Sequence, residues 1–399
     1  MSTADQGEQQ TDDAGSGPSR APVAIGLASF TSSFDRFAVS PLLVFLAVDL
    51  GASLAQTVAV AGVYFLAYGF TQPLWGMLSD RFGRLRVMRL ALAGAALAGV
   101  GSALAPGLGM LILLRGLTGA LFGGIIPTSI TFIGDTVPNH HRQSALADNM
   151  AAVAVGTALA TAVAGVVGGT LGWRVMFALP VVLALACLLA LRWVAEPERP
   201  GGQGLWRSLV ESLSNRWMLA IIALALLEGA VVLGLLTLLA PALQETGLDA
   251  ATAGLAVAAY GAATLVASRL VRPLARRWPA HRLIALGGLG MVAGYAAVAL
   301  QVSVGTVVFA AAGLGWTWAL MHTALQSWAT VVLPQLRGTA VSLFAAALFA
   351  GSSVGALVAG PLADDGRWTL LFGVTAAVAG LVAVLSFVAR RAYHVHHGQ

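Results

Sequence analysis

The feature that most constrains this chain is a series of apolar runs separated by short breaks of charged residues, proline or clustered glycine. A helix of ~20 apolar residues spans the hydrocarbon core of a bilayer. We therefore predict an all-α integral membrane protein with twelve transmembrane helices. The candidate spans are residues 23–48, 56–78, 88–105, 108–133, 144–170, 173–193, 217–243, 250–271, 282–302, 304–331, 338–361 and 368–389.

The composition excludes the main soluble classes. Apolar residues make up 58% of the chain and charged residues 10%, against ~25% charged residues in a typical soluble domain. The net charge of +5 is dispersed between the apolar runs, so it forms no basic stripe for nucleic acid. The sequence holds no metal-ligand, phosphate-loop or dithiol motif. We expect a protein embedded in the lipid bilayer that is not an enzyme, with no cofactor, no metal and no nucleic-acid partner.

The placement of arginine predicts how the chain crosses the membrane. If the spans alternate in direction, 18 of the 22 basic residues fall on one side, whereas Arg174 and Arg367 fall on the other. Because excess positive charge stays in the cytoplasm, we predict that both termini and the central linker are cytoplasmic. The predicted parts are a disordered tail, a six-helix bundle, a linker, a second six-helix bundle and a tail, at residues 1–21, 22–194, 195–216, 217–390 and 391–399.

The two halves of the chain carry similar local patterns at a nearly constant separation. The segment LWGMLSDRFGRLR, which begins at Leu74, aligns with LVRPLARRWPAHR, which begins at Leu270, and Gly156 aligns with Gly351, at offsets of 195 or 196 residues. Parallel repeats of this kind are related by an axis along the membrane normal, and the substrate site lies between them. We therefore predict two six-helix bundles related by a pseudo-twofold axis.

The loop between the second and third spans reads GMLSDRFGRLR. It resembles motif A of the major facilitator superfamily, and the matching residues are Gly76, Asp80, Arg81, Gly83 and Arg84. Arg115 and Gly119 in the fourth span are similar to motif B of the same superfamily. With Asp35 in the first span, the chain most resembles the branch of twelve-helix drug-or-metabolite:proton antiporters. The resemblance implies the two-bundle fold and a monomer that spans the cell membrane many times and binds a small-molecule substrate and protons.

Motif A is interpreted as a cytoplasmic latch between the two bundles. Asp80 can accept hydrogen bonds from the start of the eleventh helix, near residues 338–340, where the helix dipole favours an anion. By resemblance, Arg84 would pair with Asp80 and with Asp135 at the end of the fourth helix. The alternative, that the arginines of this loop only set the topology, is favoured for Arg86.

Ionisable residues at membrane depth are costly, at ~2.5–3.5 kcal/mol each on insertion scales, so each calls for an explanation. We expect Asp35, near the bilayer midplane, to carry the coupled proton, and Arg115 to tune it and release it when substrate binds. Arg36 competes with Arg115 for this role. Glu228, at similar depth in the seventh span, would carry a second proton or bind a cationic substrate. The alternatives are a structural ion pair for Asp35 and a protonated packing residue for Glu228.

The tenth span places Trp318, His322 and Gln326 on one helix face, at i, i+4 and i+8. The resemblance implies that helices one, four, seven and ten line a central cavity. Trp318 would then stack on an aromatic or cationic substrate, and His322 would hydrogen-bond it or titrate. The alternative for His322 is a hydrogen bond to a backbone carbonyl. We expect Trp316 and Trp328 to face lipid or the membrane interface.

The favoured function is a secondary active transporter that works by alternating access and exports a small organic molecule or drug in exchange for protons. The fifth span lacks the Gly-Pro pair that is usual in such antiporters. Proton-linked uptake or facilitated diffusion of a sugar or metabolite is the alternative within the transporter class. A non-transporting membrane sensor or a lipid-handling protein, from a different class, would need neither Asp35 nor Glu228.

Overall fold

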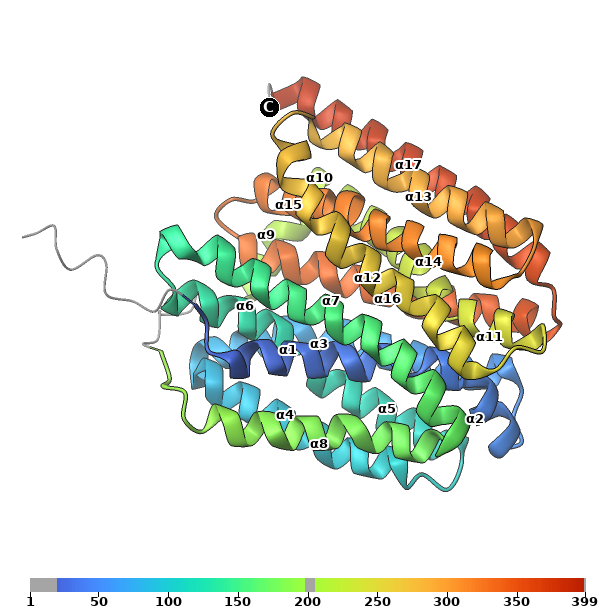
Figure 1. Cartoon of the computed structure of the whole chain (residues 1–399). Coiled ribbons are helices and arrows are strands. Elements are labelled where there is room, and N and C mark those ends of the chain that lie inside the picture. The colour runs from blue at the N-terminus through green and yellow to red at the C-terminus, as the bar shows by residue number, and fades with distance from the viewer. Residues whose placement is uncertain (1–19, 198–204, 398–399) are drawn as a thin grey trace, which may run out of the picture.

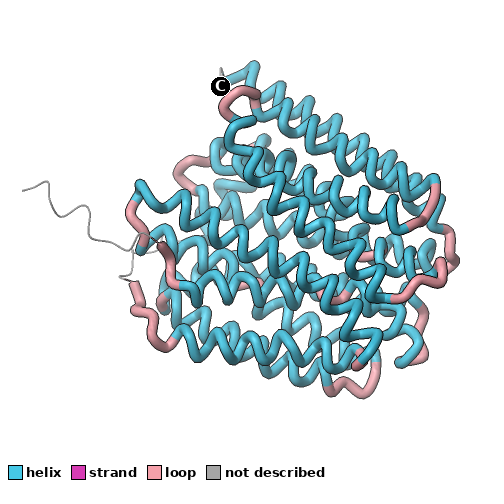
Figure 2. Tube along the Cα trace, in the orientation of Figure 1, coloured by secondary structure: helices cyan, strands magenta, loops and turns pink. Residues whose placement is uncertain are grey.

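The computed structural model describes residues 20–197 and 205–397, and every regular element in these ranges is a helix (Figures 1 and 2). Twelve helical segments within them are long and apolar enough to cross a membrane. This confirms the predicted all-α class and the twelve spans. Most of the predicted N-terminal tail, residues 1–19, lies outside the described part of the chain.

The first half of the chain contains six spans. Ser53 caps the second span, because its hydroxyl accepts a hydrogen bond of 3.2 Å from the backbone N–H of Gln56. Gly83, with a φ of 107°, separates the second span from the third. The elements are α1 (Val23–Phe37), η2 (Ser40–Leu42), α2 (Leu43–Asp49), α3 (Leu54–Phe82), α4 (Arg84–Ala103), α5 (Leu108–Phe122), α6 (Ile125–Thr136), α7 (Asn139–Thr170) and α8 (Trp173–Leu191).

The second half repeats this order after a short helix in the predicted linker. The starts of α3 and α12, of α4 and α13, and of α5 and α14 are each 196 residues apart, so the sequence offset is also an offset between helices. The elements are α9 (Leu205–Leu213), α10 (Arg216–Gly229), η3 (Ala230–Gly234), α11 (Leu239–Glu245), α12 (Ala250–Ala275), α13 (Ala280–Leu300), α14 (Val304–Thr317), η4 (Trp318–His322), α15 (Thr323–Val332), α16 (Arg337–Asp364) and α17 (Trp368–His397).

Spans one, four, seven and ten are interrupted within the membrane. In span one, Pro41 cannot donate a backbone hydrogen bond, and a 3₁₀ turn separates α1 from α2. In span four, Gly123 lies between α5 and α6, and a Cβ there would come within 2.6 Å of the Tyr68 carbonyl oxygen. Spans seven and ten contain the π-helices η3 and η4. Since π-helical turns and broken helices gather at functional sites, these four spans are the natural place to look for one.

Hydrogen bonds connect the two halves toward one end of the molecule. We call the end that carries the linker the linker side, and the other end, which carries residues 50–53, 246–249 and 365–367, the opposite side. Among the described residues, the hydrogen bonds between the halves lie toward the opposite side, and the helices of the two halves diverge toward the linker side (Figure 1). These hydrogen bonds run from Ser40 to Thr237 O (2.7 Å), from Gln244 to Pro41 O (3.1 Å) and from Leu54 N–H to Asp364 (2.8 Å).

Glycines allow the backbones of the two halves to approach closely where α7 meets α12. A Cβ on Gly165 would lie 2.1 Å from the carbonyl oxygen of Ala250, and a Cβ on Gly254 would lie 2.2 Å from that of Thr161. Small residues permit such close helix contacts in membranes. The close approach of α7 and α12 therefore depends on these two glycines.

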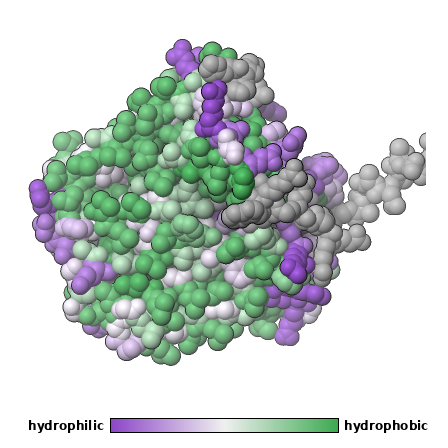
Figure 3. Space-filling view, turned by 180° about the vertical axis from the view of Figure 1, so that it is seen from behind, coloured by the Kyte–Doolittle hydropathy of each residue, from purple (hydrophilic) through white to green (hydrophobic). Residues whose placement is uncertain are grey.

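The outer surface fits a lipid environment. Apolar side chains cover the middle of the face in Figure 3, and hydrophilic side chains gather toward its two ends. Large apolar residues such as Leu97 on α4 and Leu289 on α13 are exposed. Exposed apolar surface of this extent is unusual for a soluble monomer and is expected where lipid covers it.

The end of the last helix differs from the expectation. The helix α17 continues to His397, into the predicted tail. Tyr393 is buried there, with its ring 5.3 Å from that of Trp217 and 5.5 Å from that of Trp328. The expectation was that Trp328 faces lipid or the membrane interface, and the structure contradicts the lipid-facing alternative, because this side chain is 1% exposed within an aromatic cluster. Trp316 is partly buried, and its indole N–H donates to the Leu286 carbonyl at 3.2 Å.

Candidate functional site

Asp35 and Arg115 form a buried ion pair inside the first bundle. Asp35 lies near the end of α1 and Arg115 in the middle of α5. Two nitrogens of the guanidinium donate to the two carboxylate oxygens at 2.7 and 3.0 Å, and one of them also donates to the Asp35 carbonyl at 3.1 Å. Both side chains are 1% exposed. The rings of Tyr64 and Phe177 lie 4.6 and 4.8 Å from the guanidinium carbon, so the pair is enclosed on several sides.

Arg36 points away from this ion pair. It follows Asp35 directly in α1, and consecutive helix residues do not face the same way. Its guanidinium carbon lies 4.9 Å from the ring centres of both Phe37 and Tyr68, and 5.2 Å from that of Phe349. Because Phe349 belongs to α16, Arg36 lies where the two halves meet. Of the two arginines that competed for Asp35, Arg115 is the one that pairs with it.

Glu228 and His322 lie side by side in the second bundle, both buried. His322 Nδ1 is 3.4 Å from Glu228 Oε2, while Glu228 Oε1 has no hydrogen-bond partner within the described residues. Trp318 stacks on His322, with ring centres 3.7 Å apart and planes inclined by 12°. Glu228 lies two residues before the start of η3, and Trp318 and His322 begin and end η4. A buried carboxyl beside an imidazole can share a proton with it.

The third member of the predicted stripe lies apart from this cluster. Gln326 is half-buried on α15, beyond His322. Among the described residues, no side-chain hydrogen bond joins Gln326 to Glu228, Trp318 or His322. Of the predicted stripe, the structure therefore brings together Trp318 and His322.

A ring that the sequence analysis did not single out connects the two halves. Tyr260 on α12 lies with its ring centre 5.8 Å from that of Phe37 and 6.5 Å from that of Trp318. An aromatic residue in an apolar span gives no sequence signal of such a position, since most serve as packing.

On the linker side, Arg84 gathers three partners. Its Nε donates to Asp135 at 3.0 Å, and its Nη1 donates to the Ser79 hydroxyl at 2.9 Å and to Asp80. Its side chain is 6% exposed. Gly83, which a side chain would strain at its positive φ, lets the chain turn so that Arg84 reaches both acids. The structure therefore contains the pairs of Arg84 with Asp80 and Asp135 that the resemblance implied.

The other half of the predicted latch is not formed in this structure. Asp80 is 43% exposed and is engaged by Arg84. Within the described chain, no hydrogen bond joins it to the start of α16, near Gly338. The reason is geometric, because the halves diverge on this side (Figure 1). Gly76 and Arg81 flank the cluster on α3.

Glu196, which the sequence analysis treated only as the start of the linker, completes this cluster. Its two carboxylate oxygens accept hydrogen bonds from the backbone N–H groups of Leu85 and Arg86, at 3.0 and 3.1 Å. These groups lie at the start of α4, where a helix leaves N–H groups unpaired and favours an anion. Arg89 donates in turn to the carbonyl of Leu191 at the end of α8, at 2.6 Å. The available signal was an acid that directly follows an apolar span.

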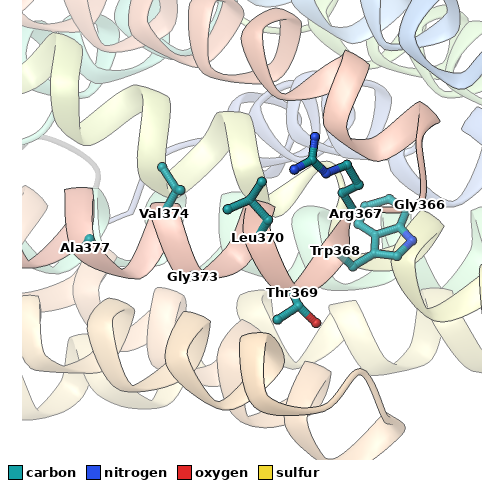
Figure 4. Close-up of a pocket in the computed structure, with 8 residues that line it drawn as sticks. All are labelled: Gly366, Arg367, Trp368, Thr369, Leu370, Gly373, Val374 and Ala377. Atoms are coloured by element: carbon teal, nitrogen blue, oxygen red, sulfur yellow. The ribbon is translucent and has the colours of Figure 1, made fainter.

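Three surface pockets lie away from the buried ionisable groups. One, of about 660 Å³, follows the start of α17, with Arg367 and Trp368 at its edge (Figure 4). The second, of about 530 Å³, lies on the opposite side between the halves and includes Asp249. The backbone hydrogen bond from Thr252 lowers the pKa of Asp249, so its carboxylate stays charged at neutral pH. The third, of about 370 Å³, adjoins Asp135 on the linker side.

Comparison with known proteins identifies the family. The family model of the Major Facilitator Superfamily matches residues 25–301 and 229–398. The chain belongs to this superfamily, and it spans about a third of the length of the first triacylglyceride transporters that it matches.

Relatives and solved structures agree with this assignment. A triacylglyceride transporter of Mycolicibacterium hassiacum is 30% identical over 42% of this chain, which spans 32% of that protein. A multi-drug resistance efflux pump PmrA homolog of Lactococcus lactis is 29% identical over 66% of this chain and 67% of its own length. Among solved structures, an inward-facing bacterial homolog of the human lysosomal transporter Spinster gives a TM-score of 0.74 at 20% identity, over 92% of this chain and 96% of its own. A D-xylose-proton symporter gives 0.75 at 19% identity, over the same shares.

Proposed function

We propose that this protein is a secondary active transporter that works by alternating access and exports a small organic molecule in exchange for protons. The observation that carries the proposal is the buried ion pair of Asp35 and Arg115, which joins two interrupted spans. A proton on Asp35 removes its negative charge and thereby releases Arg115. Because the released guanidinium is buried without a counter-ion, it must find a new partner, and this couples protonation to a change in the site.

Glu228 and His322 are proposed as the second proton-binding group. Their contact of 3.4 Å is longer than that of Asp35 with Arg115. Oε1 of Glu228 has no hydrogen-bond partner among the described residues, so it can accept a proton. The stacked ring of Trp318 covers His322 on one face. This second group lies in spans seven and ten, as Asp35 and Arg115 lie in spans one and four, so each bundle contributes one pair.

The structure is assigned to the inward-facing state, with the linker and both termini in the cytoplasm. Bundles 22–194 and 217–390 would rock as units about the contact between α7 and α12. Rocking would bring the start of α16 to Asp80 and close the linker side. In this account the hydrogen bonds of Arg84 hold Asp80 in place while the linker side is open. We propose that the protein does so as a monomer in the cell membrane.

A lipid-like substrate is a second candidate. It is supported by the similarity to mycobacterial triacylglyceride transporters, and by the mostly apolar pocket between the halves that includes Phe45, Val166 and Leu248. Proton-linked uptake of a sugar or metabolite stays the alternative direction, because one set of groups can couple a proton to movement either way.

The proposal is tested with purified protein in liposomes that contain a trapped pH-sensitive dye. Cationic drugs, sugars, organic acids and a short-chain acylglycerol are each added outside. An exchanger that takes substrate in lets protons out, so we expect the lumen to become more alkaline for one class of compound. Asp35→Asn should abolish this change, whereas Asp365→Asn, an exposed acid on the opposite side, should not.

Each other outcome contradicts proton-coupled export in a different way. Acidification of the lumen would show that substrate and proton move together, as in uptake. Entry of a radiolabelled compound without a pH change would show facilitated diffusion. Liposomes without protein report the leak of weak acids and bases through the bilayer.

A further inference from the structure

A positive charge without a counter-ion lies where the two halves meet. Arg36 is 6% exposed, and its Nε has no hydrogen-bond partner in the described ranges 20–197 and 205–397. No carboxylate in these ranges forms an ion pair with it, and Asp35, the residue directly before it, is paired with Arg115. The protein therefore leaves this guanidinium uncompensated while it neutralises a neighbouring one.

Aromatic rings hold the charge in place without neutralising it. Phe37, Tyr68 and Phe349 place their ring centres 4.9 to 5.2 Å from the guanidinium carbon. Rings stabilise a cation through their faces, but they accept none of its in-plane N–H groups in the way that an oxygen does. A buried guanidinium in this setting has donors left for an anion, and its planar fork matches a carboxylate or phosphate.

The rings continue from Arg36 into the second bundle. Phe37 contacts Tyr260, Tyr260 contacts Trp318, and Trp318 stacks on His322 beside Glu228. The row ends beside the carboxyl group of Glu228. A ligand whose anionic group lies at Arg36 would thus extend a flat apolar body along the row, with its uncharged end toward Glu228.

We propose that Arg36 binds the anionic group of the transported substrate, which is an organic anion with an aromatic or planar apolar body. The assignment rests on the proposed transport function and names its substrate class. It also gives Arg36 a role distinct from that of Arg115, which holds Asp35. The anion would be the counter-ion that Arg36 lacks. Because Arg36 lies where the two halves meet, a substrate bound there touches both bundles.

The test measures binding in detergent, without any proton gradient, to wild-type protein and variants. The probes are 1-naphthoate, its neutral isostere 1-naphthamide, and inorganic phosphate. We expect naphthoate to bind wild type more tightly than naphthamide, and Arg36→Gln to weaken naphthoate binding by about tenfold or more, as for the loss of a charge-assisted hydrogen bond. Arg36→Lys should restore part of the affinity. The control Arg367→Gln, an exposed arginine on the opposite side, should bind as wild type does.

The outcomes separate this assignment from the proposed function. Equal affinity of wild type for naphthoate and naphthamide overturns it, and this comparison needs no variant to fold. Unchanged naphthoate binding in Arg36→Gln also overturns it. If phosphate binds as tightly as naphthoate, the proposal that the ligand has an apolar body is overturned. If naphthoate binding depends on Arg36 while the liposomes show no proton exchange, the anion site stands and the antiport proposal fails.

Discussion

The carboxylate of Asp35 meets the guanidinium of Arg115 at 2.7 Å, while Arg36, one residue further along α1, faces three aromatic rings. A step of one helix residue turns a side chain by ~100°. Because of this turn, Asp35 faces Arg115 and neutralises its charge, whereas Arg36 faces away and has no counter-ion among the described residues. The two arginines that look equivalent in the sequence therefore have different roles in our account.

Breaking the ion pair from one side should destabilise the protein. Arg115→Gln leaves a buried carboxylate without its partner, and such a loss costs ~3–5 kcal/mol. Asp35→Asn together with Arg115→Gln should cost less than the sum of the two single changes, because the double variant leaves no unpaired charge. Unfolding titrations of the four proteins give this coupling. Additive losses would show that the two side chains do not stabilise each other.

Removing the charge of Glu196 should loosen the start of α4. Glu196→Gln keeps the shape of the side chain but weakens its interaction with the helix N-terminus, for an expected loss of ~0.3–1 kcal/mol. Hydrogen exchange at the amides of Leu85 and Arg86 should become faster. Glu211→Gln, at an exposed position of α9, is the matched control. Unchanged exchange at both amides would mean that Glu196 does not cap the helix in solution.

A methyl group on Gly254 should keep the opposite side from closing fully. The new Cβ would lie 2.2 Å from the Thr161 carbonyl oxygen, so the backbones of α7 and α12 must separate. Ser40→Cys, placed at a buried contact between the halves in a Cys187→Ser background, reports this opening through maleimide labelling. We expect faster labelling in Gly254→Ala. Gly373→Ala, whose Cβ would meet no atom within 4 Å, should label at the original rate, and equal rates in all proteins would refute the prediction.

Asp80 should matter for transport and not for binding. In this structure it contacts Arg84 alone among its proposed partners, and the proposed bond to α16 forms only when the linker side closes. Asp80→Asn should therefore slow transport at least about fivefold, as expected for the loss of ~1 kcal/mol of coupling, with ligand affinity unchanged. Arg86→Gln, whose exposed side chain lies at the start of α4, should retain transport. A parallel loss of affinity in Asp80→Asn would contradict the latch.

The sequence was sufficient for the twelve spans and their order because span length and the repeat are local or periodic signals. The resemblance to motif A also implied the contacts of Arg84 with Asp80 and Asp135, which the structure has. Which arginine pairs with Asp35 could not be predicted, because the rotation of α1 is set by its packing against α7 and α8. Trp328 was placed wrongly for a similar reason. The helix α17 brings Tyr393, which lies 65 residues further along the chain, against Trp328. The sequence of one helix alone does not indicate this contact.

Glu196 shows a second limit of sequence reasoning. A lone acid after an apolar span reads as the start of a linker, and only the return of α8 to the start of α4 gives it two backbone partners. The π-helices η3 and η4 are also tertiary features, since no proline or charge interrupts residues 230–234 or 318–321.

The measurement that tests the central claim most directly is proton release from purified protein in lightly buffered detergent on addition of a ligand. The account predicts that a binding ligand displaces protons in stoichiometric amounts from wild type, and that this release is lost in Asp35→Asn. Ligand binding, shown by thermal stabilisation, without proton release in either protein would contradict proton-coupled exchange and favour a uniporter or a sensor.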